Sequence, residues 1–202
     1  MKKRKKNKSD DANFFSLNYK KSWSFIKESK KFIWAVIAIF VFSLILGVFF
    51  QPTEISKIIL DYIEKVVEET QDMSSLEMIS FIFLNNLRVG FMGIIYGFLF
   101  GIPPVLFALG NGYVVGFVSS LAVSSSGAVS LLSLLPHGIF ELPAIFISFG
   151  MGIKLGSFIF YKDKLNKFVY FFKESLRVFL FVIVPLLIIA AVIEGILIFV
   201  FN

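Results

Sequence analysis

The residues of this chain best suited to chemistry stand in the stretch LLPHGIFELPAIF, residues 134–146. His137 is the only histidine, and Glu141 follows it four positions later within an otherwise apolar run. Residues four apart share one face of a helix, so the imidazole and the carboxylate would lie side by side. Such a pair fits three kinds of site: a structural polar contact, a proton relay, or part of a metal site.

The metal site is the weakest of these interpretations. A catalytic zinc ion usually has three protein ligands, often several of them histidines, whereas this chain has one His and no Cys. Carboxylates or a second subunit would have to supply the missing ligands. We therefore predict no metal, no cofactor and no catalytic residue, and we favour a protein that is not an enzyme. The lack of Cys also excludes disulfides and thiol catalysis.

The elements that carry this pair have the composition of membrane spans. The chain is 57% hydrophobic and only 17% charged, whereas soluble domains are about 45–50% apolar. Its long charge-free runs can cross a bilayer as helices. We predict an all-α polytopic membrane protein with about five transmembrane helices and an amphipathic outer helix at residues 53–77. The expected spans are residues 32–50, 79–101, 103–123, 136–160 and 178–201.

The sequence predicts two regions, a basic cytoplasmic tail at residues 1–31 and a single membrane domain at residues 32–202. The tail holds eleven Lys and Arg against three acids. Basic residues directly before an apolar run mark the cytoplasmic side and are attracted to anionic lipid. Nucleic acid is the weaker partner for this tail, and we predict none.

The charged segments between the spans predict the topology. Residues 53–77 contain seven acids and two bases, which fits the outer side, whereas residues 161–177 contain five bases and two acids. Both basic segments should lie in the cytoplasm because Lys and Arg accumulate there. We therefore expect a multi-pass protein of the cell membrane whose N-terminus is cytoplasmic and whose C-terminus lies outside.

Residues 124–135 are too short and too polar at their start to form a span. We expect an outer loop followed by a short apolar segment that lies in the bilayer or dips into it. In an alternative assignment the fourth span covers residues 128–150, which moves His137 and Glu141 toward the middle of the membrane. The number of crossings is the same in both assignments.

Glycines recur at four-residue spacing in three of the predicted helices. Small residues at this spacing let two helix backbones approach closely. We predict that these glycines form the helix-packing faces of the bundle: Gly93, Gly97, Gly101, Gly112, Gly116, Gly152 and Gly156.

Ionisable residues inside predicted spans usually face the bundle interior, a partner or water. At about 1.5 Å of rise per residue, Arg88 lies roughly 13 Å and Glu141 roughly 8 Å from the outer starts of their helices. Glu194 also falls in the outer half of its helix. We expect a polar cluster at this depth, whereas Lys154 should extend toward the headgroups. The cluster comprises Asn85, Asn86, Arg88, His137, Glu141 and Glu194.

Two interpretations of this cluster remain open. In the first, Glu141 pairs with Arg88, and the other polar groups satisfy one another, so the cluster is structural or binds a partner. In the second, His137 exchanges protons near neutral pH with Glu141 or Glu194 as a relay partner. We favour the first.

Three stretches together resemble the stage II sporulation protein M family. They are FLNNLRVG, ALGNGYVVG and LLPHGIFELPAIFIS, and the similarity extends over most of residues 30–202. The family's polar signature corresponds to Asn85, Asn86, Arg88, Asn111, Gly112, His137, Gly138 and Glu141. The resemblance implies an integral membrane protein. In sporulation such a protein anchors two peptidoglycan-degrading partners, a role that nothing in these residues indicates for this chain.

The sequence therefore predicts a scaffold or anchoring subunit of a membrane complex. Its expected partners are the lipid bilayer and either another membrane protein or a second copy. The alternative is a small proton- or ion-coupled transporter or channel component that uses the His, Glu and Arg residues of the cluster.

Overall fold

The protein is helical, as the sequence predicts. The computed structural model describes the backbone of residues 8–201 and the side chains of residues 13–131, 138–139 and 141–193. The described residues contain no β-strand. The helices are α1 (Lys8–Glu28), α2 (Lys30–Phe49), α3 (Thr53–Thr70), α4 (Ser75–Ile95), α5 (Ile102–Ser126), α6 (Leu131–Gly156), α7 (Lys164–Val178) and α8 (Val184–Phe201).

Five stretches of the described chain are long and apolar enough to cross a membrane. This agrees with the expected polytopic architecture. The stretches are Lys30–Phe49, Ser75–Phe98, Ile102–Ser126, Glu141–Phe160 and Lys164–Ile193.

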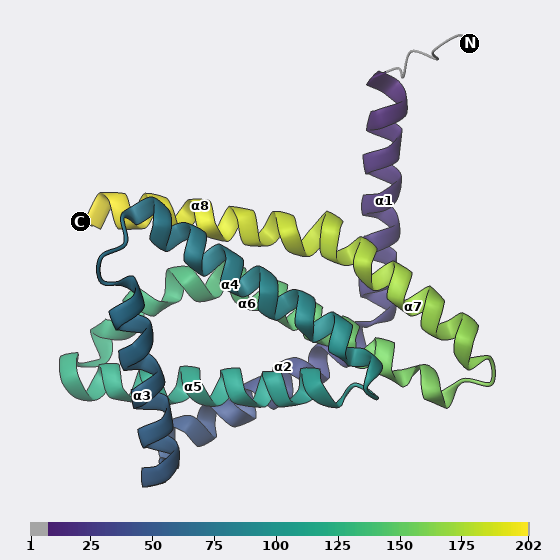
Figure 1. The fold of residues 1–202 in the computed structure, drawn as a ribbon. Coiled ribbons are helices and arrows are strands. Elements are labelled where there is room, and N and C mark those ends of the chain that lie inside the picture. Colours follow the sequence, from purple (N-terminus) through teal and green to yellow (C-terminus); the bar gives the residue numbers. More distant parts are fainter. Residues whose placement is uncertain (1–7, 202) are drawn as a thin grey trace.

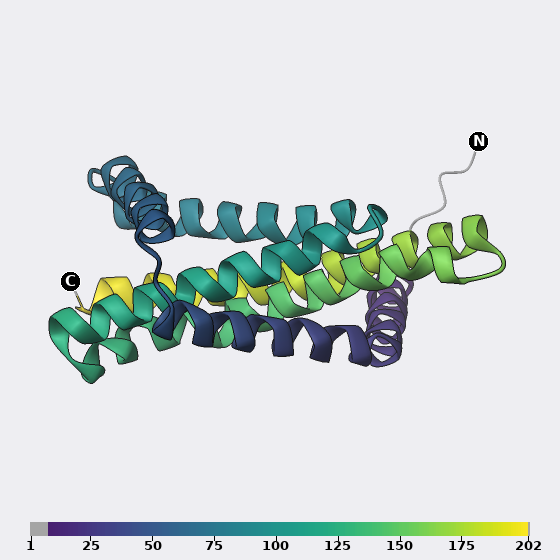
Figure 2. The ribbon, with the colours of Figure 1, turned by 90° about the horizontal axis from the view of Figure 1, so that it is seen from below.

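The five apolar helices run along the length of the molecule, and α1 and α3 stand across its two ends (Figure 1). The second view shows the same arrangement, with α2 and α5 side by side (Figure 2). Helix α6 is central because it contacts α2, α4, α5, α7 and α8. The core follows from this position: Ala144, Met151 and Leu155 of α6 are fully buried among side chains of the other helices.

Helix α4 begins four residues earlier than predicted, because a capping box fixes its start. The backbone N–H of Glu77 donates to Ser74 Oγ, and the Glu77 carboxylate accepts from the Ser74 backbone N–H at 2.8 Å. Together these bonds satisfy N–H groups that a helix start leaves free. The amphipathic helix predicted at residues 53–77 therefore ends at Thr70 as α3, and Glu77 belongs to α4.

The loop predicted at the start of residues 124–135 is shorter than expected. Helix α5 continues to Ser126, and Gly127 ends it with a φ of 78°, a left-handed conformation that favours glycine. One 3₁₀ turn, Ala128–Ser130, then leads directly into α6. Helix α6 therefore begins at Leu131 instead of Pro136.

The basic segment predicted at residues 161–177 forms α7, which continues into the last span. A π-helical turn at Phe179–Ile183 joins α7 to α8, and the Val184 N–H bonds to the Phe179 carbonyl oxygen. Proline removes an N–H and crowds the carbonyl four residues before it. The π turn immediately before Pro185 absorbs this irregularity, at the place where the sequence predicts a kink.

Candidate functional site

Glycines bring α2 and α5 into backbone contact. A Cβ at Gly112 or Gly116 would overlap carbonyl oxygens of α2, and a Cβ at Gly47 would overlap the Tyr113 carbonyl oxygen. At the same crossing, the Ser43 hydroxyl donates to the Leu109 carbonyl oxygen at 2.5 Å. Such close approach is what small residues permit in membrane helices.

A second glycine contact joins α4 to α6. A Cβ at Gly97 would overlap the backbone of Gly152, a Cβ at Gly152 would overlap the Gly93 carbonyl oxygen, and a Cβ at Gly156 would overlap the backbone of Gly101. The contacts pair increasing residue numbers on both helices, so α4 and α6 run in parallel. All seven glycines predicted as packing residues lie at these two contacts. Gly97 belongs to the 3₁₀ turn Tyr96–Phe98 that follows α4, and Gly101 is the residue directly before α5.

The register of α4 against α6 places Arg88 away from Glu141. A Cβ at Gly90 would lie 3.0 Å from Ser148 Oγ, so these two residues stand opposite each other. Arg88 then falls opposite residue 146, which is five residues or roughly 8 Å of helical rise beyond Glu141. Arg88 is also about 200° around the helix from Gly90, at roughly 100° per residue.

Arg88 consequently points outward from the bundle. Its side chain is exposed, and no described side chain forms an ion pair with it. Asn85 is also exposed, whereas Asn86 is half-buried and lies four residues before Gly90 on the face that packs against α6. The structure thus divides the three polar residues of α4 between two faces, which the predicted single cluster did not anticipate.

Two members of the predicted cluster carry side chains outside the described residues. His137 lies in the first half of α6, and Glu194 lies in α8. The rings of Phe91 on α4 and Phe179 in the π-helical turn before α8 contact each other, with centroids 5.4 Å apart. Because α8 runs opposite to α4, the backbone of Glu194 is roughly 18 Å from the level of Arg88 along the bundle.

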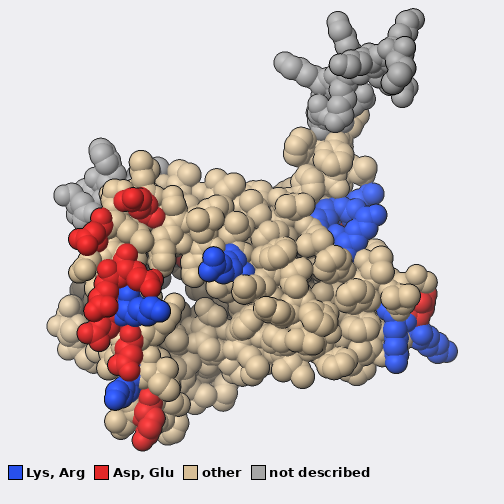
Figure 3. Space-filling model, in the orientation of Figure 1, with Lys and Arg blue, Asp and Glu red and all other residues tan. Residues whose placement is uncertain are grey.

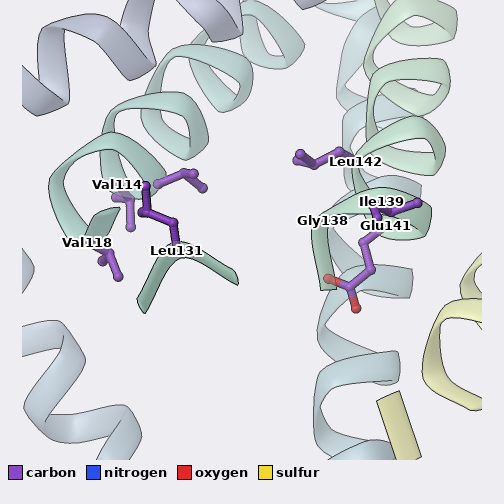
Figure 4. A pocket seen from close by; sticks show the side chains of 8 residues that line it. Val114, Val118, Leu131, Gly138, Ile139, Glu141 and Leu142 are labelled. Carbon is purple, nitrogen blue, oxygen red and sulfur yellow. The ribbon is translucent and has the colours of Figure 1, made fainter. Parts of the chain in front are cut away.

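Glu141 lines a cavity of about 590 Å³ between α5 and α6. Val114 and Val118 form the α5 wall, and Leu142 reaches into the space from α6 (Figure 4). The Glu141 side chain also comes from α6, but its carboxylate points away from Leu142 (Figure 4). Among the lining residues whose side chains the structure describes, Glu141 alone is ionisable, and its side chain is half-buried. An apolar pocket with one carboxylate can bind an apolar group or pass a proton to a neighbour.

Lys154 does not extend to the surface as predicted. The residue is 5% exposed, and its ammonium lies 3.4 Å from the Glu28 carboxylate and 4.0 Å from the centre of the Phe25 ring. The Phe171 ring of α7 lies on another side at 5.4 Å. A buried ammonium needs such a carboxylate and aromatic faces to replace its water. Two features of the sequence could have indicated this ion pair. Lys154 is a lysine within an apolar span, and Glu28 is an acid among the basic residues of the tail.

A second polar contact holds α1 against α7. Arg177 donates to the Asn18 side-chain oxygen at 3.0 Å and forms an ion pair with Glu174. Between Asn18 and Glu28, the small residue Ser22 is fully buried, as is Ser175 of α7. Helix α1 is therefore part of the folded bundle, although it belongs to the predicted tail.

Charge is separated between the two ends of the molecule. Figure 3 shows acidic side chains over α3 at one end, hereafter the acidic end, and basic side chains beside α1 and before α7 at the other, the basic end. Helix α3 buries only Ile59, and it exposes Ile58, Tyr62 and Val67 along with its acids. It is thus an unpartnered amphipathic helix.

The described residues contain no group of three His, Cys, Asp or Glu side chains that could hold a metal ion. Of the buried or half-buried ionisable groups in the described chain, Lys154 and Arg177 contact α1, Glu174 pairs with Arg177, Lys167 lies over tyrosine rings, and Glu141 lines the α5–α6 cavity.

These features define a polytopic α-helical membrane protein whose helices meet through glycine contacts. The chain belongs to the stage II sporulation protein M family, whose model matches residues 36–197. It is also 30% identical over 189 residues to an uncharacterized protein of Methanocaldococcus jannaschii, and the match covers 83% of this chain and 81% of that protein. No solved structure matches the chain.

Proposed function

We propose that the protein is a scaffold or anchoring subunit of a membrane complex. The observation that carries this proposal is the exposed position of Arg88 within the Ser75–Phe98 span. A charged side chain facing lipid at this depth is costly. A partner that covers it with polar groups removes that cost.

Arg88 is too deep in the span for the lipid headgroups to satisfy it easily. It is ten residues, or roughly 15 Å, from the end of the span at Phe98. The neighbouring face of α4 includes exposed Asn85 and Met92. These residues form one surface with Arg88, which we call the Arg88 face. It suits a transmembrane helix that presents a carboxylate for the guanidinium.

The acidic helix α3 provides a second place for contact outside the apolar region. Its charges would attract a soluble domain with a basic surface, and its exposed apolar side chains would pack beneath that domain. A rigid glycine-packed bundle with these two surfaces could hold a partner in a fixed orientation relative to the membrane.

Crosslinked co-purification from the native membrane tests this proposal. The wild-type chain should retain a membrane protein that is lost from Arg88→Gln. Lys162→Gln, an exposed change at the basic end, is the matched control and should retain it. Equal recovery from wild type and Arg88→Gln, or no retained protein in either, would contradict the proposal.

The cavity beside Glu141 favours a second candidate function, a proton- or ion-coupled component. In that case the purified protein in sealed vesicles should carry a pH-driven flux that disappears in Glu141→Gln and His137→Ala. The scaffold proposal expects no flux from the purified chain and a stable complex with a partner.

A further inference from the structure

Helix α1 exposes aromatic side chains along one face. Phe15, Tyr19 and Trp23 follow one another at four-residue spacing and are 61%, 54% and 46% exposed. This face adjoins the packed face of α1 that holds Ser22 and Phe25 against the bundle. Aromatic residues of this kind accumulate at the boundary between headgroups and acyl chains.

Lysines form the next face of the same helix. Lys20 and Lys27 are seven residues apart, so they lie on nearly the same side, and both are exposed. Lys20 also comes one turn after Ser16. A helix with aromatic residues on one side and lysines beside them lies in a membrane interface, where the lysines meet lipid phosphates.

A groove of about 550 Å³ separates α1 from the start of the last span. Phe15, Ser16 and Tyr19 line it from α1, and Leu180 and Pro185 line it from the other side. The latter two belong to the apolar stretch Lys164–Ile193. The wall of the groove on the side of the span is thus apolar, whereas the α1 wall carries the hydroxyl groups of Ser16 and Tyr19. The volume of the groove falls within the ~300–1,000 Å³ of small-molecule sites.

We propose that this groove binds one anionic phospholipid. An acyl chain lies against Leu180 and Pro185, and the phosphate lies beside Ser16, one helical turn from Lys20. Lys27 lies roughly 16 Å further along the helix than Ser16 and adds to the positive potential of this surface. Charge complementarity selects this occupant. The lysines favour a net negative headgroup over a zwitterionic one, while the apolar wall of the groove excludes a free phosphate as the main ligand.

The chain offers an internal reporter for this site. It has two tryptophans, and Trp34→Phe leaves Trp23, next to the groove, as the single fluorophore. In reconstituted vesicles, brominated phosphatidylglycerol should quench Trp23 more than brominated phosphatidylcholine does. Each lysine near the surface contributes about fivefold to the preference for anionic lipid. The double change Lys20→Gln and Lys27→Gln should therefore lower the preference about tenfold or more.

Two further variants distinguish lipid binding in the groove from a general attraction of surface lysines to anionic lipid. Lys57→Gln with Lys65→Gln removes two exposed lysines from α3 and should leave the lipid preference unchanged. Ser16→Phe keeps the lysines and fills the groove from an exposed position, so it should also lower the preference. Equal quenching by the two lipids, an unchanged preference in the double lysine variant, or full preference in Ser16→Phe would each overturn the proposal.

Discussion

The ammonium of Lys154 lies 3.4 Å from the carboxylate of Glu28, which is 126 positions earlier in the chain. This ion pair joins the basic-end part of α6 to the last turn of α1. The pair is asymmetric, since the Lys154 side chain is 6% exposed and the Glu28 side chain is 52% exposed. Glu28 thus compensates a charge that is almost completely withdrawn from water.

This asymmetry predicts unequal effects of removing the two partners. Glu28→Gln leaves a buried ammonium without its counterion and should lower the free energy of unfolding by about 1–3 kcal/mol. Lys154→Met removes the buried charge and retains a long apolar side chain, so it should cost less. Unfolding in detergent micelles measures both. The double variant should match Lys154→Met, and equal, additive losses would contradict a pair of this kind.

The glycine contact between α2 and α5 predicts a sharp difference between neighbouring positions. Gly112→Ala and Gly116→Ala place a methyl group against α2 backbone and should each destabilise the bundle by about 1–3 kcal/mol. Gly110→Ala is the control on the same helix, because a Cβ there meets no atom within 4 Å. It should leave the melting temperature unchanged or raise it, since Ala favours helix over Gly. Equal losses at all three positions would show that helix contact is not the cause.

The register of α4 and α6 predicts that Arg88 and Glu141 act independently. Arg88→Met and Glu141→Gln should change the free energy of unfolding additively, within about 0.5 kcal/mol. A double-mutant cycle in detergent measures this coupling. A coupling energy well above that value would restore the direct pairing that the sequence suggested.

The separation of charge predicts the orientation of the protein in the membrane. Because the chain lacks Cys, a single engineered Cys reports its own accessibility. A membrane-impermeant maleimide added to intact cells should label Glu68→Cys on α3, whereas it should label Lys162→Cys only after the cells are opened. The reverse pattern would place the basic end outside, against the positive-inside rule.

Much of the fold could be predicted because its signals are local. Apolar stretches of sufficient length marked the five spans, and glycines at four-residue spacing marked the faces that meet. The start of α4 was misplaced although Ser74 and Glu77 have the spacing of a capping box. The turn at Gly127 was missed because a single glycine does not reveal whether the polar serines before it continue the helix.

The candidate sites depend on the direction in which side chains point and on contacts between distant segments of the chain. A hydropathy pattern gives neither. The burial of Lys154 requires α1 to fold back onto α6, and no local pattern specifies that contact. The outward direction of the Arg88 side chain could have been predicted from the sequence. Gly90 and Gly93 mark the inner face of α4, and residue 88 lies on the opposite side. Grouping ionisable residues by depth alone concealed this difference.

Crosslinking from the Arg88 face tests the scaffold proposal most directly. A photoreactive amino acid at Met92, one turn from Arg88 and 39% exposed, should form an adduct with another membrane protein in native membranes. The same group at exposed Leu106 on α5 is the control and should form none. The Met92 adduct should disappear when Arg88→Gln is added. An adduct of twice the chain's own mass would identify a second copy as the occupant. The absence of any adduct at position 92, or equal adducts at positions 92 and 106 that persist in Arg88→Gln, would contradict the account.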